Sequence, residues 1–178
     1  MLLKARRSAF APQSSLSEHH LKRGHGMPDL PASKRLRIGR YNESNRIYLL
    51  TTNTLEREPI FSDFRLGRLV VQQFRIAQYK GLATSLAWVV MPDHFHWLVS
   101  LEKGSLADLM RQVKSKSTRV VNAVAGRQGR LWQPGFHDYA VRREESLEGI
   151  ARYIVASPLR AGLVKKFGDY PLWDAIWV

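Results

Sequence analysis

Two histidines stand one residue apart near the middle of the chain, where their spacing could bring both imidazoles to one ion. His94 and His96 flank Phe95 at the start of an apolar segment that reaches Leu101. Alternate side chains of an extended strand share a face, so the two imidazoles would lie side by side while Phe95 points into a core. Imidazole binds zinc, manganese, copper or nickel, and it tolerates magnesium where oxygen atoms complete the site.

The histidine pair has two interpretations. Each histidine could be a hydrogen-bonded residue on a half-exposed face of a sheet. Structural metal sites normally have four ligands, so a pair instead favours an open site for a divalent ion, with vacant positions for oxygen atoms of a substrate. The sequence therefore predicts either a polar sheet face or an open ion site at His94 and His96.

Strand and helix patterns alternate around the pair. Apolar, aromatic and β-branched runs predict strands over 46–52, 84–91, 94–101 and 136–142. Apolar residues at three-and-four spacing predict helices bounded by about 62 and 81, 105 and 126, and 144 and 157. This order fits an α+β domain in which an antiparallel sheet carries helices on one face, close to the ferredoxin-like arrangement of RRM domains. The apolar segment 159–178 is expected to dock on this domain.

The second predicted helix has an apolar and a basic face. Its inner face is expected to consist of Leu106, Leu109, Met110, Val113, Val120, Val121 and Val124. Its outer face carries Arg111, Lys114, Lys116 and Arg119. These charges form either an ordinary solvated surface or a surface for phosphate groups.

The last predicted helix carries a tyrosine away from its apolar stripe. Tyr153 has Gly149 one turn before it and Ser157 one turn after it. Glycine lowers helix stability by about 1 kcal/mol relative to alanine, so we expect Gly149 to provide space beside the tyrosine. Tyr153 is then either a half-buried ring at a helix edge or a reactive group near the histidine pair.

The composition favours a polyanionic partner. The 178 residues have a formal net charge of +13 and no cysteine, which excludes disulfides and thiolate metal sites. Residues 1–40 hold nine Lys or Arg residues against two acids and predict a flexible basic arm, of which 1–26 could be an upstream extension. Residues 41–178 are expected to form one domain. Neither a membrane-spanning run nor a secretory signal is visible, so we expect a cytoplasmic, nucleoid-associated protein without membrane contact.

Three motifs resemble those of the REP-associated tyrosine transposases, single-tyrosine relatives of the IS200/IS605 transposases within the HUH endonucleases. They are Met-Pro-Asp-His-Phe-His-Trp at 91–97, Trp-Gln-Pro-Gly-Phe-His at 132–137, and Tyr-Ile-Val-Ala-Ser-Pro-Leu-Arg-Ala-Gly-Leu-Val at 153–164. The resemblance extends from about residue 36 to the final tryptophans. It implies the HUH endonuclease fold and a DNA nuclease with strand-transfer activity.

The resemblance also implies roles for individual residues. His94 and His96 would hold Mg²⁺ or Mn²⁺ at the scissile phosphate of single-stranded DNA. Tyr153 would be the nucleophile that forms a 5′-phosphotyrosine link and frees a 3′-hydroxyl. Related proteins often have Asn or Gln four residues after the tyrosine as a further ligand. This chain has Ser157 there, a shorter and weaker ligand.

The implied substrate is a REP hairpin, a repetitive extragenic palindrome, with a short single-stranded guide sequence at its foot. Basic and aromatic side chains suit recognition of folded single strands. The residues expected to contact DNA are Arg35, Arg37, Arg40, Tyr41, Trp132, Phe136, His137, Arg142, Arg143 and Arg160. Trp132 and Phe136 could equally belong to the core, and His137 could be a neighbour of the metal site or a structural strand residue.

Two other functions fit the same residues. One is an RRM-like module that binds nucleic acid without catalysis. The other is a metal-dependent hydrolase in which His94, His96 and His137 act on water without a covalent step. Transposase relatives that pair a tyrosine helix with the histidines of the other subunit are dimers. The final segment of this chain favours a monomer that holds its own tyrosine helix.

Overall fold

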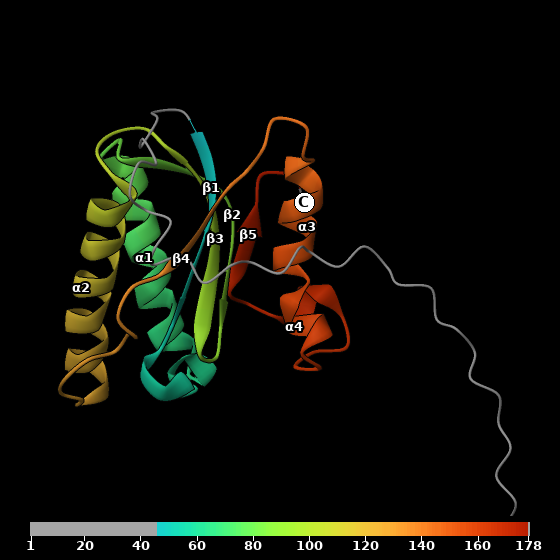
Figure 1. Ribbon diagram of the computed structural model, residues 1–178. Helices are drawn as coiled ribbons and strands as arrows, with labels where there is room; N and C mark the ends of the chain where they lie inside the picture. Colours follow the sequence, from blue (N-terminus) through green and yellow to red (C-terminus); the bar gives the residue numbers. More distant parts are fainter. Residues whose placement is uncertain (1–45, 178) are drawn as a thin grey trace, which may run out of the picture. The chain divides into compact units, whose positions relative to one another are not determined.

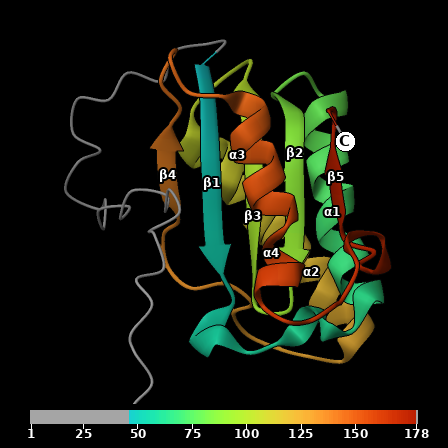
Figure 2. The ribbon, with the colours of Figure 1, turned by 90° about the vertical axis from the view of Figure 1, so that its right-hand side faces the viewer.

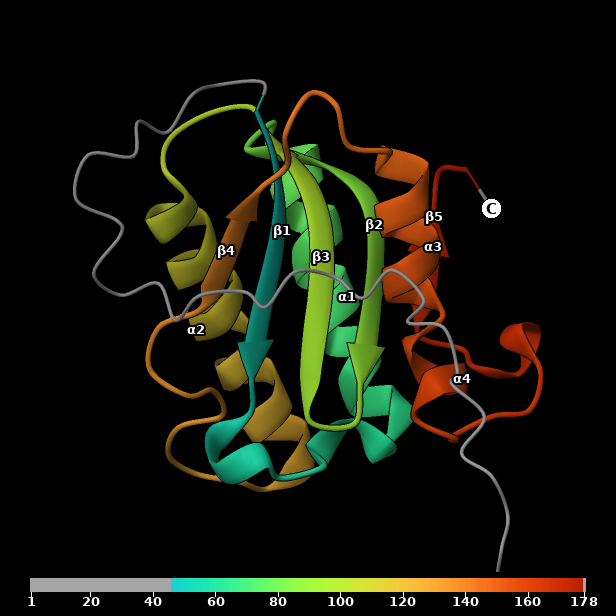
Figure 3. The same ribbon diagram turned by 45° about the vertical axis from the view of Figure 1, so that its right-hand side comes forward.

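The computed structural model describes residues 46–177, which form a five-stranded antiparallel sheet in the order β4-β1-β3-β2-β5. The strands are β1 (Arg46–Asn53), β2 (Ala83–Met91), β3 (His94–Leu101), β4 (His137–Ala140) and β5 (Trp173–Ala175). Figure 3 shows β3 between β1 and β2. The predicted α+β class is confirmed, and β1 to β4 follow the ferredoxin-like arrangement. The short edge strand β5 was not predicted, because three residues carry no strand pattern.

The helices lie on both faces of the sheet, so the expectation that they share one face is wrong. Figure 1 shows α1 (Phe64–Tyr79) and α2 (Leu106–Ala125) on one side, and α3 (Leu147–Val155) and α4 (Ser157–Arg160) on the other. Figure 2 looks onto the sheet with α3 in front. The reason is that α3 has an apolar stripe of its own, Ala151, Ile154 and Val155, which is buried where α3 packs on β2 and β5.

Helix α1 covers the aromatic side of β3. Asp63 caps the helix by accepting a hydrogen bond from the Arg65 backbone N–H at 3.0 Å. Phe74 stacks on Trp97 with ring centroids 4.4 Å apart and meets Phe95 edge-on at 5.0 Å. Phe95 and Trp97 are fully buried, as the alternation of β3 predicts. The histidines of β3 therefore point to the opposite face, toward α3 and α4.

Helix α2 begins at its predicted bound, where Ser105 caps it by accepting from the Asp108 backbone N–H. The expected core residue Val124 is 63% exposed, in the last turn of the helix beyond the buried residue Val121. Ser117 is buried instead, and its hydroxyl accepts a hydrogen bond from Trp132 Nε1 at 2.9 Å. Within residues 46–177 no helix is both long and apolar enough to cross a membrane.

The last predicted helix is shorter than expected and is followed by a separate one. Ser146 caps α3 by accepting from the Gly149 backbone N–H, so the helix starts at Leu147 rather than at 144. A Cβ on Gly149 would meet the Ser146 side chain at 3.3 Å. The glycine therefore leaves room for the cap, and the expectation that it leaves room for Tyr153 is wrong. Pro158 stands in the first turn of α4.

The segment after α4 docks on the sheet, as its apolar residues predict. Tyr170 donates a hydrogen bond from its hydroxyl to the Val90 carbonyl oxygen at 2.7 Å, and burial raises the pKa of Tyr170 to about 12. Leu172 is buried against α1, where a Cβ on Gly67 would come within 2.4 Å of its Cδ1 atom. Gly67 thus lets the final segment approach α1 closely.

We expect Gly67→Ala to lower the free energy of unfolding by about 1–3 kcal/mol, because the new methyl group overpacks against Leu172. In an ordinary helix the same change stabilises by about 1 kcal/mol. Leu172→Ala provides the matched background, since it removes the atom that would clash. Urea unfolding of the two single variants and the double variant tests this. A Gly67→Ala penalty that persists in the Leu172→Ala background contradicts the close approach.

Candidate functional site

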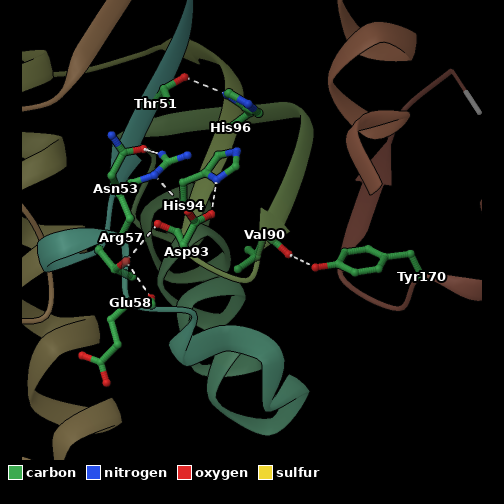
Figure 4. A network of polar contacts seen from close by, with 10 residues as sticks. Thr51, Asn53, Arg57, Glu58, Val90, Asp93, His94, His96 and Tyr170 are labelled. Carbon is green, nitrogen blue, oxygen red and sulfur yellow. Dashed lines mark hydrogen bonds and ion pairs between the residues drawn. The ribbon is translucent and has the colours of Figure 1, made fainter. Parts of the chain in front are cut away.

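His94 and His96 lie side by side on β3, with ring centroids 4.9 Å apart and ring planes at 78°. Each ring has one nitrogen in a hydrogen bond, as Figure 4 shows. His96 Nδ1 lies 2.7 Å from Thr51 Oγ1 on β1, and His94 Nδ1 lies 2.6 Å from Asp93 Oδ1. A carboxylate only accepts, so His94 donates through Nδ1 and keeps a lone pair on Nε2. The Thr51 hydroxyl can accept from Nδ1 of His96 in the same way.

Asp93 is itself held in place by Arg57, from the turn that follows β1. Its second carboxylate oxygen forms an ion pair with Arg57 Nε at 2.9 Å. Arg57 also donates from Nη1 to Asn53 Oδ1 at 2.6 Å, and Asn53 stands opposite His94 in the sheet register. Polar contacts of this kind orient a metal-ligating imidazole and raise its basicity. Both histidines therefore have the polar support that metal-binding histidines usually have.

The turn that carries Arg57 is strained. Glu56 and Arg57, in the 3-10 turn η1 (Leu55–Arg57), have φ angles of 54° and 60°. A left-handed conformation of a non-glycine residue costs about 1–3 kcal/mol and persists only where neighbouring contacts impose it. Here the Thr54 hydroxyl contacts the Glu58 and Asp93 carbonyl oxygens at 2.8 and 3.0 Å. These contacts hold the Arg57 guanidinium against Asp93.

Both histidines are neutral at physiological pH. Burial is the main cause that lowers the pKa of His96 to about 3, and the charges of His94, Arg160 and Arg57 act in the same direction. Burial also lowers the pKa of His94, against the opposing effect of the Asp93 carboxylate. Neutral imidazole is the form that binds metal ions. The Nε2 atoms, the neutral rings and their polar support fit a divalent ion.

The histidine pair supplies only part of the ligands that a metal ion needs. Among the described residues, no group of three or more His, Cys, Asp or Glu side chains could hold a metal ion. His137 stands on β4 opposite Thr51, which lies between it and His96 in the sheet. This position favours the other two roles considered for His137, a base contact or a structural strand residue, and the alternative three-histidine hydrolase has no three-histidine group among the described residues. Two imidazoles leave vacant positions for substrate oxygens.

Tyr153 lies on α3, on the face of the sheet that carries the histidines, and its side chain is 40% exposed. The Arg160 guanidinium carbon lies 3.8 Å from the centre of the Tyr153 ring. Arg160 also donates to the Tyr153 carbonyl oxygen and, at 2.9 Å, to Ser157 Oγ. Arg160 thus connects α4 with the tyrosine helix, and its charge contributes to the lowered pKa of His96.

Ser157, the expected third ligand, is buried at the start of α4. Its hydroxyl oxygen accepts the hydrogen bond from Arg160. An oxygen held by a guanidinium has less electron density to give to a metal ion. The role of Ser157 as a ligand stays a prediction, and its observed contact fixes Arg160 instead.

The expected DNA-contacting residues have different environments. Trp132 is buried, packing against Phe61 and Phe95, so the prediction that it contacts bases is wrong. Phe136 lines a cavity beside α2. His137 is exposed on β4, and exposed side chains between β4 and α3 include those of Arg142 and Arg143. The basic arm 1–40, with Arg35, Arg37, Arg40, and also Tyr41 lie outside the described residues.

Four residues of the site were missed from the sequence: Thr51, Asn53, Arg57 and Asp93. Asp93 had a visible signal, since it directly precedes His94, but a Pro-Asp pair between two strands is typical of a turn. Thr51 and Asn53 depend on the register of β1 with β3. Arg57 reaches Asp93 only because of two left-handed residues, which no sequence pattern indicates.

The comparisons with known proteins agree with this fold and arrangement. The family model described as "Transposase IS200 like" matches residues 44–157, more than half of the chain, so the protein belongs to this family. A curated relative, the REP-associated tyrosine transposase of Escherichia coli (strain K12), is 30% identical over 87 residues, which cover 48% of this chain and 50% of the relative. The chain thus matches about half the length of this relative.

Two solved structures are also similar. One is a REP-associated tyrosine transposase bound to a REP hairpin, with a TM-score of 0.59 and 24% identity, covering 75% of this chain and 79% of the other. The other is a putative transposase from Deinococcus radiodurans, with a TM-score of 0.47 and 24% identity, covering 64% and 92%. The first similarity supports the fold, and the family expected from the three motifs is confirmed.

We expect Asp93→Asn to weaken Mn²⁺ binding by about 10- to 100-fold, because the neutral amide no longer polarises the His94 ring or pairs with Arg57. Asp108→Asn at the start of α2 is the matched control, with the same change of charge away from the histidines. Isothermal titration calorimetry measures both. Equal Mn²⁺ affinity in Asp93→Asn and the unmodified protein argues against this supporting contact.

The neutral state of His96 predicts a pH dependence of stability. Its pKa is about 3 in the folded chain and about 6.5 in the unfolded chain, so below pH 6.5 the unfolded chain binds more protons. The contribution of His96 to stability is complete above pH 6.5 and declines as the pH falls toward 3. Between pH 8 and pH 5 the loss is about 2 kcal/mol.

Urea unfolding with a chelator present, at pH 8 and pH 5, measures this loss. His96→Gln is the control, since it removes the titrating ring and leaves the remaining ionisable groups unchanged. The unmodified protein should lose more stability between these pH values than the variant does. The same loss in both would mean that His96 is not held neutral.

Proposed function

We propose that this protein cleaves and rejoins single-stranded DNA through a covalent link to Tyr153, with a divalent ion held by His94 and His96. The observation that carries the proposal is Arg160, which lies over the Tyr153 ring and whose charge acts on His96. A phenol, a cation and two neutral imidazoles thus belong to one face of one chain. The substrate class follows from the family and from the net charge of +13.

His94 and His96 would bind the ion through Nε2, and a bound Mg²⁺ or Mn²⁺ would polarise the scissile phosphodiester and offset its charge in the transition state. Thr51 and Asp93 keep the two rings oriented for this task. The vacant coordination positions leave room for phosphate oxygens. Ser157 or water would take the third coordination position.

Tyr153 would supply the nucleophile. Its phenolic oxygen forms a bond to phosphorus, the bond from phosphorus to the 3′-oxygen breaks, and the proton lost by the phenol balances the one gained by the 3′-hydroxyl. The 5′-phosphotyrosine link retains the energy of the cleaved bond. A 3′-hydroxyl can therefore reverse the cleavage, or a different strand can take the phosphoryl group.

Arg160 would position both the nucleophile and the substrate. Its contacts with the Tyr153 carbonyl oxygen and with Ser157 fix the junction of α3 and α4. Arg160 is exposed at this junction, where a DNA phosphate would approach. This arrangement suits an enzyme better than a passive RRM-like module, which needs no cation over a tyrosine.

The partner we propose is a single-stranded or hairpin DNA of the REP type, because both relatives named above as REP-associated tyrosine transposases share the fold or the sequence. Arg142, Arg143, His137 and Phe136 would contact it from the described residues. Arg35, Arg37, Arg40 and Tyr41 would contact it from the region before β1. We further propose that the protein acts as a monomer, because α3 packs on β2 and β5 of the same chain.

Tyr153→Phe should abolish the covalent protein–DNA adduct while leaving DNA binding within about twofold, since only the nucleophilic oxygen is removed. A denaturing gel with a labelled hairpin oligonucleotide and Mn²⁺ detects the adduct, and fluorescence anisotropy measures binding. Tyr79→Phe is the matched control, because Tyr79 is 93% exposed on α1. An adduct with Tyr153→Phe, or none with the unmodified protein, would refute the proposed function.

A further inference from the structure

A cavity of about 640 Å³ lies between α2 and the loop that precedes β4. Its walls are mainly apolar. The buried side chains of Met110, Leu131 and Trp132 lie behind it, and half-buried Phe136 and exposed Ala107 line the part that a ligand could reach. Cationic side chains stand among the lining residues, namely Arg111, Lys114 and Arg130. Apolar and aromatic walls with positive charges are the chemistry that binds a nucleotide, whose base is flat and apolar and whose phosphate is anionic.

The loop wall of this cavity is attached to the strand beside the histidines. The Gln133 backbone N–H donates to the Asn53 carbonyl oxygen at 2.9 Å, and Asn53 stands opposite His94. At the other end of the loop, His137 pairs with Thr51, whose hydroxyl contacts His96. Two strand spacings, about 10 Å, separate β4 from β3. A DNA strand on the histidines needs only a few nucleotides to pass over the edge strand β4.

Lys114 keeps the loop in this position. Its ammonium group donates to the Gln133 carbonyl oxygen at 2.7 Å and also to the Gly135 carbonyl oxygen. Phe136 follows directly and faces α2, whereas His137 belongs to the strand row that leads to His96. The loop thus has one side toward the cavity and continues into a strand that borders the proposed catalytic face.

We propose that this cavity takes one unpaired base from the single-stranded flank of the DNA substrate, with Arg111 and Arg130 at the neighbouring phosphates. This proposal rests on the proposed function for the identity of the strand. It adds a recognition site for a single base on the opposite side of β4 from the histidines. It also gives the outer face of α2, which carries Arg111 and Lys114, a role beyond solvation.

Ala107→Trp tests the proposal, because Ala107 is an exposed residue that lines the cavity and a larger ring there fills it. Ala123→Trp is the matched control, an exposed alanine on the same helix that does not line the cavity. Both changes are made in the Tyr153→Phe background, so that binding is measured without cleavage. Urea unfolding checks that both variants keep the stability of their parent.

Hairpin oligonucleotides with a single abasic position, moved stepwise along the single-stranded flank, are titrated by fluorescence anisotropy. We expect Ala107→Trp to weaken binding of the intact oligonucleotide by about 10- to 100-fold, the range for loss of one stacked base. One abasic position should weaken binding to the parent by a similar factor and have little further effect on Ala107→Trp. Ala123→Trp should behave as its parent at every position.

The proposal is overturned if Ala107→Trp binds the intact oligonucleotide as tightly as its parent. It is equally overturned if its loss of affinity is matched by no single abasic position, since the cavity then holds no base. These results leave adduct formation by Tyr153 untouched. Failure of the unmodified protein to form an adduct would count against the proposed function, whatever the binding series shows.

Discussion

The packing of α3 and α4 on the histidine face of the sheet is the constraint on which the rest of the site depends. A ferredoxin-like sheet with helices on one face alone leaves its other face to solvent, and a histidine pair there would be only a polar surface. The buried residues Ala151, Ile154 and Val155 hold α3 against β2 and β5. This second layer brings Tyr153 and Arg160 to the face of the half-buried histidines, and the charge of Arg160 contributes to the lowered pKa of His96.

The final segment maintains that layer. β5 pairs with β2, Tyr170 bonds to the Val90 carbonyl oxygen, and Leu172 packs where Gly67 has no side chain. In the turn that follows β1, the strained residues Glu56 and Arg57 hold the Arg57 guanidinium against Asp93. Strain at such a turn is tolerated where it sets the geometry of a functional group. The docked final segment and the strained turn both orient the side chains of the site, and neither takes part in the reaction itself.

Much of this arrangement follows from sequence patterns, and the exceptions have physical reasons. The alternation of β3 correctly separates His94 and His96 from Phe95 and Trp97, and the predicted bounds near 62 and 105 lie within two residues of the starts of α1 and α2. A sequence pattern shows which face of a helix is apolar, but not which side of the sheet the helix covers. The prediction that α3 shares a face with α1 and α2 was therefore wrong. Trp132 has the residue type of a base-stacking ring, yet its buried bond to Ser117 makes it core.

The claim that one chain brings the nucleophile to its own histidines is tested by mixing two inactive variants. His94→Ala together with His96→Ala removes the ion site, and Tyr153→Phe removes the nucleophile, each in a separate preparation. Equimolar mixtures are incubated with Mn²⁺ and a labelled hairpin oligonucleotide, and denaturing gels detect the covalent adduct. A site built within one chain predicts no adduct in the mixture. An adduct in the mixture would show that the tyrosine of one chain works with the histidines of another, and would contradict the account.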